Sequence, residues 1–89
     1  MKMKIKQGFM LREVAGNYIV VAVGSAVKQF NGVINLNETG AFLWKLLEKG
    51  GDEDSLYKAL SDEYEVDEET ARADIRAFLE RVTKAGLTE

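Results

Sequence analysis

The stretch from Gly32 to Trp44 constrains the fold most, because it reads as a β-strand that runs directly into an α-helix. Val33 to Leu36 is rich in β-branched and apolar residues, which favours a strand. Asn37 follows as a suitable N-cap, since its side-chain oxygen can accept a hydrogen bond from an orphan amide of the first helical turn. The helix is predicted from about Glu38 to Lys49, where two consecutive glycines end it. Strand signals precede this corner, and helix signals follow it.

Two further strands are predicted before the corner. Phe9 to Val14 forms the first strand, a turn follows at Ala15-Gly16-Asn17, and Tyr18 to Val23 forms the second. Gly24 to Asn31 is expected to be a loop with a short extended piece around Val27, and Asn31-Gly32 a second turn. Short strands joined by turns predict an antiparallel three-stranded sheet.

Two more helices are predicted after the corner. Asp52 caps a helix from about Glu53 to Tyr64, and Asp67 caps another that continues to about Ala85. The order predicts an α+β fold: a three-stranded antiparallel sheet followed by three helices, in a winged helix-turn-helix-like arrangement. The 89 residues are expected to form a single domain, with residues 1–8 as a flexible N-terminal segment.

The residues that the chain lacks argue against an enzyme. It has no Cys and no His, and so neither a thiolate nucleophile nor the commonest general base and metal ligand. Acidic pairs such as Asp62/Glu63 are sequence neighbours that diverge on a helix. We therefore predict no catalytic residues, metal or cofactor. The longest apolar run, Tyr18 to Val23, is six residues, so no membrane span is expected and the cytoplasm is the predicted location.

Three sequence pieces together resemble a known family. The strongest is Leu36-Asn37-Glu38-Thr39-Gly40-Ala41-x-x-Trp44. The others are the Gly50-Gly51 break before an acidic helix start, and Asp74-x-x-x-Phe78-Leu79 followed after six residues by Gly86-Leu87. Their order resembles PqqD, the small protein of pyrroloquinoline quinone biosynthesis, and the related RiPP recognition elements, over roughly Phe9 to Leu87. One departure is Lys49, where an acidic residue is common in the family.

The resemblance implies that the chain binds the leader of a ribosomally made precursor peptide and presents it to a modifying enzyme, such as a radical-SAM protein. The leader would add as a strand to the exposed edge of the third strand and lie against the third helix. In that strand, Ile34 and Leu36 are expected to face the core. The expected peptide-binding residues are Val33, Ile34, Asn35, Leu36, Asp74, Ala77, Phe78 and Arg81.

The choice between the two flanks of the third helix stays open at this point. One flank carries Asp74, Ala77 and Arg81, and the other carries Arg72, Arg76 and Thr83. We choose the first flank, with Phe78 as the floor of the groove. The plainer alternative is that Asp74 and Arg81 are solvated helix charges and that Phe78 is simply core.

The main rival function is a winged-helix DNA-binding regulator. Its recognition helix would begin at Asp67-Glu68-Glu69, and three carboxylates would repel phosphates. No nucleic-acid partner is therefore expected. A third possibility is a module that pairs with a second copy, so the predicted state is a monomer or a weak homodimer. Residues 1–51 carry seven basic and three acidic residues, a net charge of +4, against five and twelve in residues 52–89, a net charge of −7. The split reflects either solvated faces or a basic half that meets an acidic peptide.

Overall fold

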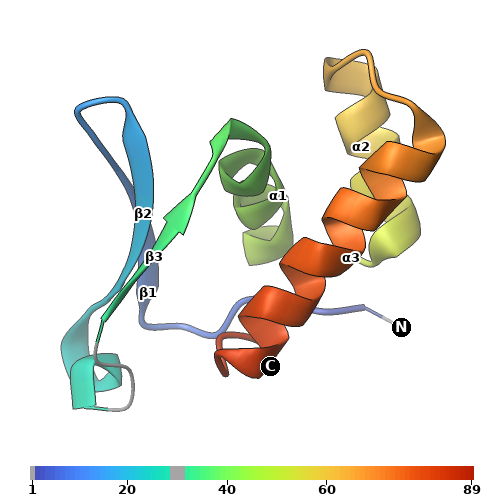
Figure 1. Ribbon diagram of the computed structural model, residues 1–89. Helices are drawn as coiled ribbons and strands as arrows, with labels where there is room; N and C mark the ends of the chain where they lie inside the picture. Colours follow the sequence, from blue (N-terminus) through green and yellow to red (C-terminus); the bar gives the residue numbers. More distant parts are fainter. Residues whose placement is uncertain (1, 29–31) are drawn as a thin grey trace.

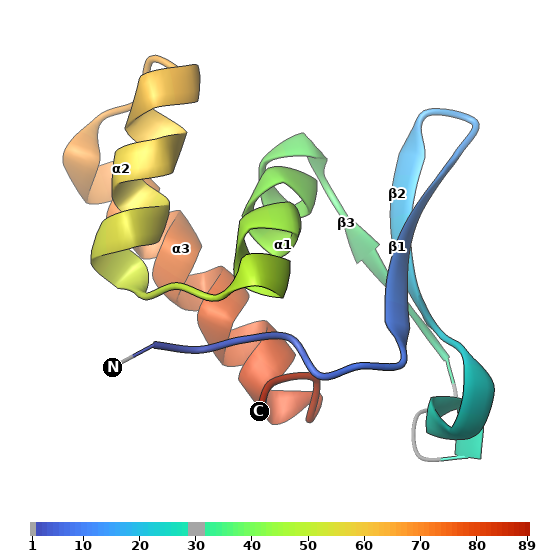
Figure 2. The same ribbon diagram turned by 180° about the vertical axis from the view of Figure 1, so that it is seen from behind.

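The computed structural model describes residues 2–28 and 32–89, which form a small sheet followed by three helices (Figure 1). This confirms the predicted α+β order. The elements are β1 (Phe9–Val14), β2 (Asn17–Ala22), the short 3-10 helix η1 (Gly24–Lys28), β3 (Val33–Leu36), α1 (Glu38–Lys49), α2 (Glu53–Glu63) and α3 (Glu68–Lys84). All three α-helices lie to one side of the sheet in both views (Figures 1 and 2).

The sheet is antiparallel with the strand order β1-β2-β3, which makes β3 one of its edges. A two-residue turn joins β1 to β2. Ala15 and Gly16 have φ values of 53° and 82°, and positive φ at both positions gives the turn the twist that suits a tight hairpin. Glycine reaches this conformation at little cost, whereas Ala15 is held in it by the pairing of Val14 with Asn17.

Each helix begins at the residue predicted to cap it. The side chains of Asn37, Asp52 and Asp67 accept hydrogen bonds from the backbone amides of Gly40, Ser55 and Thr70, respectively. At Asp52 a second hydrogen bond runs in the opposite direction, because the Asp52 amide donates to the Ser55 hydroxyl oxygen at 3.0 Å. These caps satisfy amides that the first helical turn leaves without partners, and so fix where α1, α2 and α3 start.

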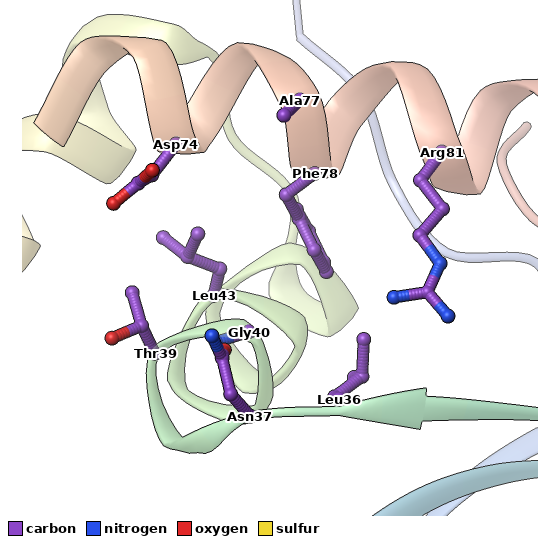
Figure 3. Close-up of a pocket in the computed structure, with 9 residues that line it drawn as sticks. All are labelled: Leu36, Asn37, Thr39, Gly40, Leu43, Asp74, Ala77, Phe78 and Arg81. Carbon is purple, nitrogen blue, oxygen red and sulfur yellow. The ribbon is translucent and has the colours of Figure 1, made fainter. Parts of the chain in front are cut away.

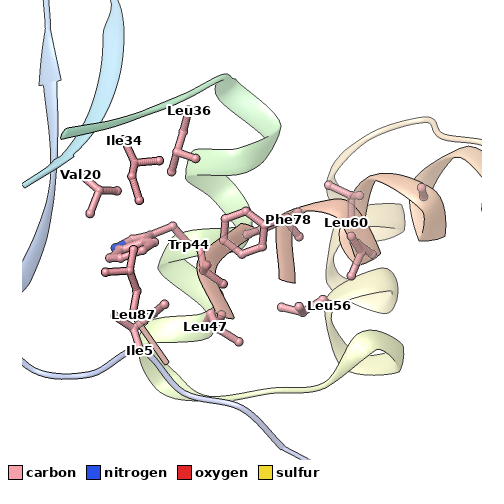
Figure 4. Close-up of a cluster of buried hydrophobic side chains, with 14 residues drawn as sticks. Ile5, Val20, Ile34, Leu36, Trp44, Leu47, Leu56, Leu60, Phe78 and Leu87 are labelled. Carbon is pink, nitrogen blue, oxygen red and sulfur yellow. The ribbon is translucent and has the colours of Figure 1, made fainter. Parts of the chain in front are cut away.

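The hydrophobic core runs from the inner face of the sheet to the space among the three helices, and Trp44 of α1 lies at its sheet side (Figure 4). Trp44 is fully buried, and its indole N–H donates to Oε2 of Glu48 at 3.2 Å. Around it pack Val20 and Ile34 from the sheet and Leu87 from the C-terminal end. The core therefore joins strand, helix and tail into one unit.

The N-terminal segment docks on this core. Ile5 is buried, its amide donates to the Leu47 carbonyl, and Met3 exchanges two backbone hydrogen bonds with Gly51. Further along, the Lys6 amide donates to the Leu87 carbonyl. The sequence predicts a flexible segment over residues 1–8, whereas the structure ties residues 3–6 to the end of α1 and to the C-terminus.

Two other predictions in this half differ from the structure. The second strand lies one residue earlier than predicted, at Asn17–Ala22, and the predicted extended piece around Val27 is wrong, because residues 24–28 form η1. A 3-10 turn closes with local i to i+3 hydrogen bonds and needs no apolar periodicity, so no apolar pattern marks it in the chain. Asn31 of the predicted Asn31-Gly32 turn and the end of the predicted loop fall on residues 29–31, outside the described residues.

Candidate functional site: a groove between β3 and α3

The side chains of the edge strand β3 alternate between the core and the outer face of the sheet. Ile34 and Leu36 are each only 8% exposed, whereas Val33 is 56% exposed. This confirms the predicted orientation. Within the part of the chain that the structure describes, β3 pairs with β2 on one side only. Its other side therefore offers backbone amides and carbonyls to a further strand.

A groove of about 290 Å³ lies beside the end of β3, between the first turn of α1 and the middle of α3. Figure 3 shows side chains from both walls pointing into it. Leu36, Leu43 and Phe78 give it an apolar floor, and Phe78 is only 6% exposed. The remaining lining residues are Asn37, Thr39, Gly40, Asp74, Ala77 and Arg81.

Gly40 allows the strand and the helix to meet closely at this groove. A β-carbon at Gly40 would lie 3.2 Å from Oδ1 of Asn37 and 3.3 Å from the β-carbon of Leu36, tighter than ordinary contacts. The Gly40 amide also donates to that Asn37 oxygen at 2.7 Å. The Leu-Asn-Glu-Thr-Gly stretch thus shapes the wall of the groove as well as starting α1.

Two opposite charges stand on the α3 wall of the groove. Asp74 and Arg81 are both exposed and lie at its two ends (Figure 3). They are seven positions apart in the sequence, which is about 10 Å along a helix. Neither takes part in an ion pair within residues 2–28 and 32–89. Both charges are therefore free to meet a ligand.

The opposite flank of α3 faces α2, and its arginines are occupied. Arg72 donates to Oε2 of Glu53 at 2.8 Å, to Asp54 at 2.9 Å and to Glu68 at 2.9 Å. Its guanidinium also lies 4.7 Å from the centre of the Tyr57 ring, a cation–π contact. These hydrogen bonds, that to Asp54 first, raise the pKa of Arg72. Arg72 therefore acts as a clamp between α2 and α3.

Arg76 adds to the same contact. Its Nε donates to Oε1 of Glu53 at 2.8 Å. The hydrogen bonds from Arg76, and then from Arg72, lower the pKa of the Glu53 carboxyl below its ordinary value of 4.5. Glu53 thus stays ionised at neutral pH and holds both arginines, so this flank has a structural role.

The eight residues predicted from the sequence separate into two sets. Five of them line the groove: Leu36, Asp74, Ala77, Phe78 and Arg81. The other three, Val33, Ile34 and Asn35, lie on β3 next to the groove and outside its lining. Sequence reasoning missed Asn37, Thr39, Gly40 and Leu43 as groove residues, although they lie in the stretch that it interpreted as a helix cap and as the strongest piece of the family resemblance. The role of all these residues in binding stays a prediction.

The described residues contain no cluster of three or more acidic side chains placed to hold a metal ion. No helix in that part of the chain is both long enough and apolar enough to cross a membrane.

Two solved structures and one family model match the chain. The chain is similar to the structure described as "TbiB1 in Complex with the TbiA(beta) Leader Peptide", with a TM-score of 0.74, 24% identity, and coverage of 97% of this chain and 94% of that chain. It is also similar to "Lasso peptide synthetase B1 complexed with the leader peptide", with a TM-score of 0.73, 20% identity, and coverage of 98% and 96%. At these identities the likeness shows a shared fold.

No curated protein sequence matches the chain. The sequence model of the family described as "Coenzyme PQQ synthesis protein D (PqqD)", however, matches residues 10–87. That range runs from β1 to the buried Leu87 and includes both walls of the groove. The chain therefore belongs to the PqqD family.

Proposed function

We propose that this protein captures the leader of a ribosomally made precursor peptide, which adds as a strand to the free edge of β3 and lies in the groove against α3. The observation that carries the proposal is the position of an unpaired strand edge beside an apolar groove. Backbone hydrogen bonds to β3 would supply affinity, and side chains of the leader that enter the groove would supply specificity.

The groove suggests what the leader segment carries. An apolar side chain fits the floor formed by Leu36, Leu43 and Phe78. Asp74 and Arg81 would bind a basic and an acidic side chain at the two ends. The separation of about 10 Å along α3 corresponds to about three residues of an extended peptide. We therefore expect a leader with opposite charges about three residues apart, on either side of an apolar anchor.

The protein would act on the leader without transforming it. Its partners would be the precursor peptide and a modifying enzyme, such as a radical-SAM protein, to which the bound leader is presented. We place this activity in the cytoplasm, where ribosomes release precursor peptides. The similarity in fold to two leader-peptide complexes supports this proposal, and so does membership of the PqqD family.

DNA binding is the rival function, and one structural feature counts against it. Asp67, Glu68 and Glu69 are all exposed at the start of α3, the end that a helix-turn-helix protein directs into the major groove. Carboxylates at that position would face phosphates, where binding needs Lys or Arg.

Titration of the protein with a synthetic peptide tests the proposal. The peptide is the leader portion of the short precursor encoded beside the gene, and its binding is followed by isothermal calorimetry. We expect a Kd of about micromolar, because a flexible peptide must be ordered as it binds. The Asn35→Pro variant should lose most of this affinity, since proline interrupts pairing along β3.

The controls separate the outcomes. The Asn35→Pro variant must keep a cooperative thermal transition, so that loss of affinity reports the strand and not unfolding. Duplex DNA should give no heat at the same concentrations. Unchanged leader affinity in folded Asn35→Pro would exclude β3 as the docking edge. Binding of DNA but of no leader peptide would make the protein a regulator.

A further inference from the structure

The outer face of the sheet carries a row of apolar side chains that the core does not use. Residues paired across neighbouring antiparallel strands point to the same face. Met10 pairs with Val21, and Val21 pairs with Val33, so these three form one row across all three strands. The core-facing row beside it is Leu11, Val20 and Ile34. The register therefore places Met10, Val21 and Val33 on the side away from the core.

The outer face stays exposed in the folded chain. Met10 is 44% exposed and Val14 is 54% exposed. Ile19 and Val21 are partly buried, yet neither belongs to the core cluster or to the side chains packed against it. The α-helices lie on the opposite side of the sheet (Figures 1 and 2). The outer face thus gathers exposed or partly exposed apolar side chains from all three strands.

The size and charge of this face argue against a second copy of the chain as its occupant. Strands of six residues or fewer, about 4.8 Å apart, give a face of roughly 200–300 Å². A stable interface needs about 800 Å² from each partner. Arg12 lies on this face, opposite Ile19, and has no ion pair within the described ranges. A two-fold dimer would place both copies of Arg12 in one small apolar interface.

We propose that the outer face of the sheet docks the peptide-modifying enzyme, through an apolar patch with a carboxylate opposite Arg12. This inference rests on the proposed function, because it requires a leader on β3. The enzyme must reach the peptide that leaves the β3 edge, and the outer face is continuous with that edge through Val33 and Asn35. An enzyme that contacts both the outer face and the bound leader would bury more area than the outer face alone offers.

The test compares two variants that add acidic residues at exposed apolar positions. Met10→Glu/Val14→Glu changes the outer face on β1, away from the β3 edge. Val66→Glu is the control for an acidic residue at an exposed apolar position elsewhere, because Val66 is 38% exposed in the connection between α2 and α3. The probe is the purified peptide-modifying enzyme encoded beside the gene, immobilised for interferometry and presented with each protein carrying the leader peptide. Thermal melting confirms that both variants are folded.

We expect Met10→Glu/Val14→Glu to weaken binding to the enzyme by about tenfold or more, and Val66→Glu by less than about twofold. Leader affinity should be equal in all three proteins, and this measurement tests the proposed function separately. Equal enzyme binding by both variants, or no complex with the unaltered protein, would overturn the docking surface. A dimer in sedimentation experiments that Met10→Glu/Val14→Glu dissociates would assign the face to a second copy instead.

Discussion

Both flanks of α3 carry arginine, but in opposite surroundings. Arg72 and Arg76 face α2, and between them bind three carboxylates, with Glu53 shared by both. Arg81, one turn and a half further along, lines the groove beside β3 and has no ion pair within the described part of the chain. The same helix therefore uses arginine for two purposes: to hold the fold together and to offer a charge outward.

The surroundings of a charged side chain distinguish a structural charge from a binding charge in a small domain. A guanidinium that is already surrounded by carboxylates and an aromatic ring gains little from a ligand, because its donors are occupied. A guanidinium that stands alone beside an apolar floor keeps its donors for a carboxylate of the peptide. The flank that carries Asp74 and Arg81 is thus the one on which we place the leader.

The largest difference between the flanks should appear when one arginine on each is replaced by an acidic residue. Arg81→Glu should raise the Kd for the leader peptide by about tenfold or more, since it replaces an attraction with a repulsion. Arg76→Glu makes the same change of charge on the same helix and should alter the Kd by less than about twofold. Calorimetric titration of both variants gives the answer, and equal loss in both would show that only net charge matters.

A smaller effect is expected at the other end of the groove. Asp74→Lys should raise the Kd for the leader by a few-fold, because Asp74 is a single exposed carboxylate whose pairing with a basic side chain is screened by water. Asp62→Lys on α2 is the control with the same change of charge, and should leave the Kd unaltered. The same titration at higher salt should reduce the difference between Asp74→Lys and the unaltered protein. A difference that persists at high salt would argue against an ionic contact.

For the stability of the domain we expect the reverse, with a larger effect from the arginines that face α2 than from Arg81. Arg72→Met removes three charge-assisted hydrogen bonds and a cation–π contact while keeping much of the side chain volume. We expect the Tm to fall by several degrees and the leader affinity of the folded variant to be unchanged. Arg81→Met, its counterpart on the groove flank, should leave the Tm almost where it is. A larger fall in Tm for Arg81→Met would contradict the assignment of roles.

The smallest expected effect is on the pH dependence of stability. The pKa of Glu53 lies below its ordinary value of 4.5 because of the hydrogen bonds from Arg76 and Arg72. Its contribution to stability is therefore complete above pH 4.5 and is lost as the pH falls through the lowered pKa. Thermal melts should show the unaltered protein to be more stable than Glu53→Gln at neutral pH, with the difference shrinking below pH 4.5. A constant difference would mean that the carboxylate charge of Glu53 is unimportant.

Local signals predicted the helices and the edge strand well. Asn37 and the glycines after Lys49 set the bounds of α1 at Glu38 and Lys49, as predicted, because capping depends on residues next to each other in the chain. The alternation within β3 likewise predicted that Ile34 and Leu36 face the core.

Features that depend on distant residues were harder to predict. The alternation of lysines with Met3 and Ile5 gave no hint of docking, because the partners of this segment are Gly51, Leu47 and Leu87. The two flanks of α3 could not be separated by composition either. Glu53 determines which flank of α3 has its arginines occupied by ion pairs. It lies 19 and 23 residues before the two arginines that it binds.

Docking of the leader between β3 and α3 is tested by a backbone NMR titration of the isotope-labelled protein with the leader peptide. We expect shifts in the amides of residues 33–36 and along α3 at residues 74, 77 and 81. Cross-strand contacts between amides of the peptide and those of β3 should appear as well, whereas Arg72 and Arg76 should move little. Shifts centred on Arg72 and Arg76, with β3 unaffected, would show that the leader does not dock between β3 and the flank of α3 that carries Asp74 and Arg81.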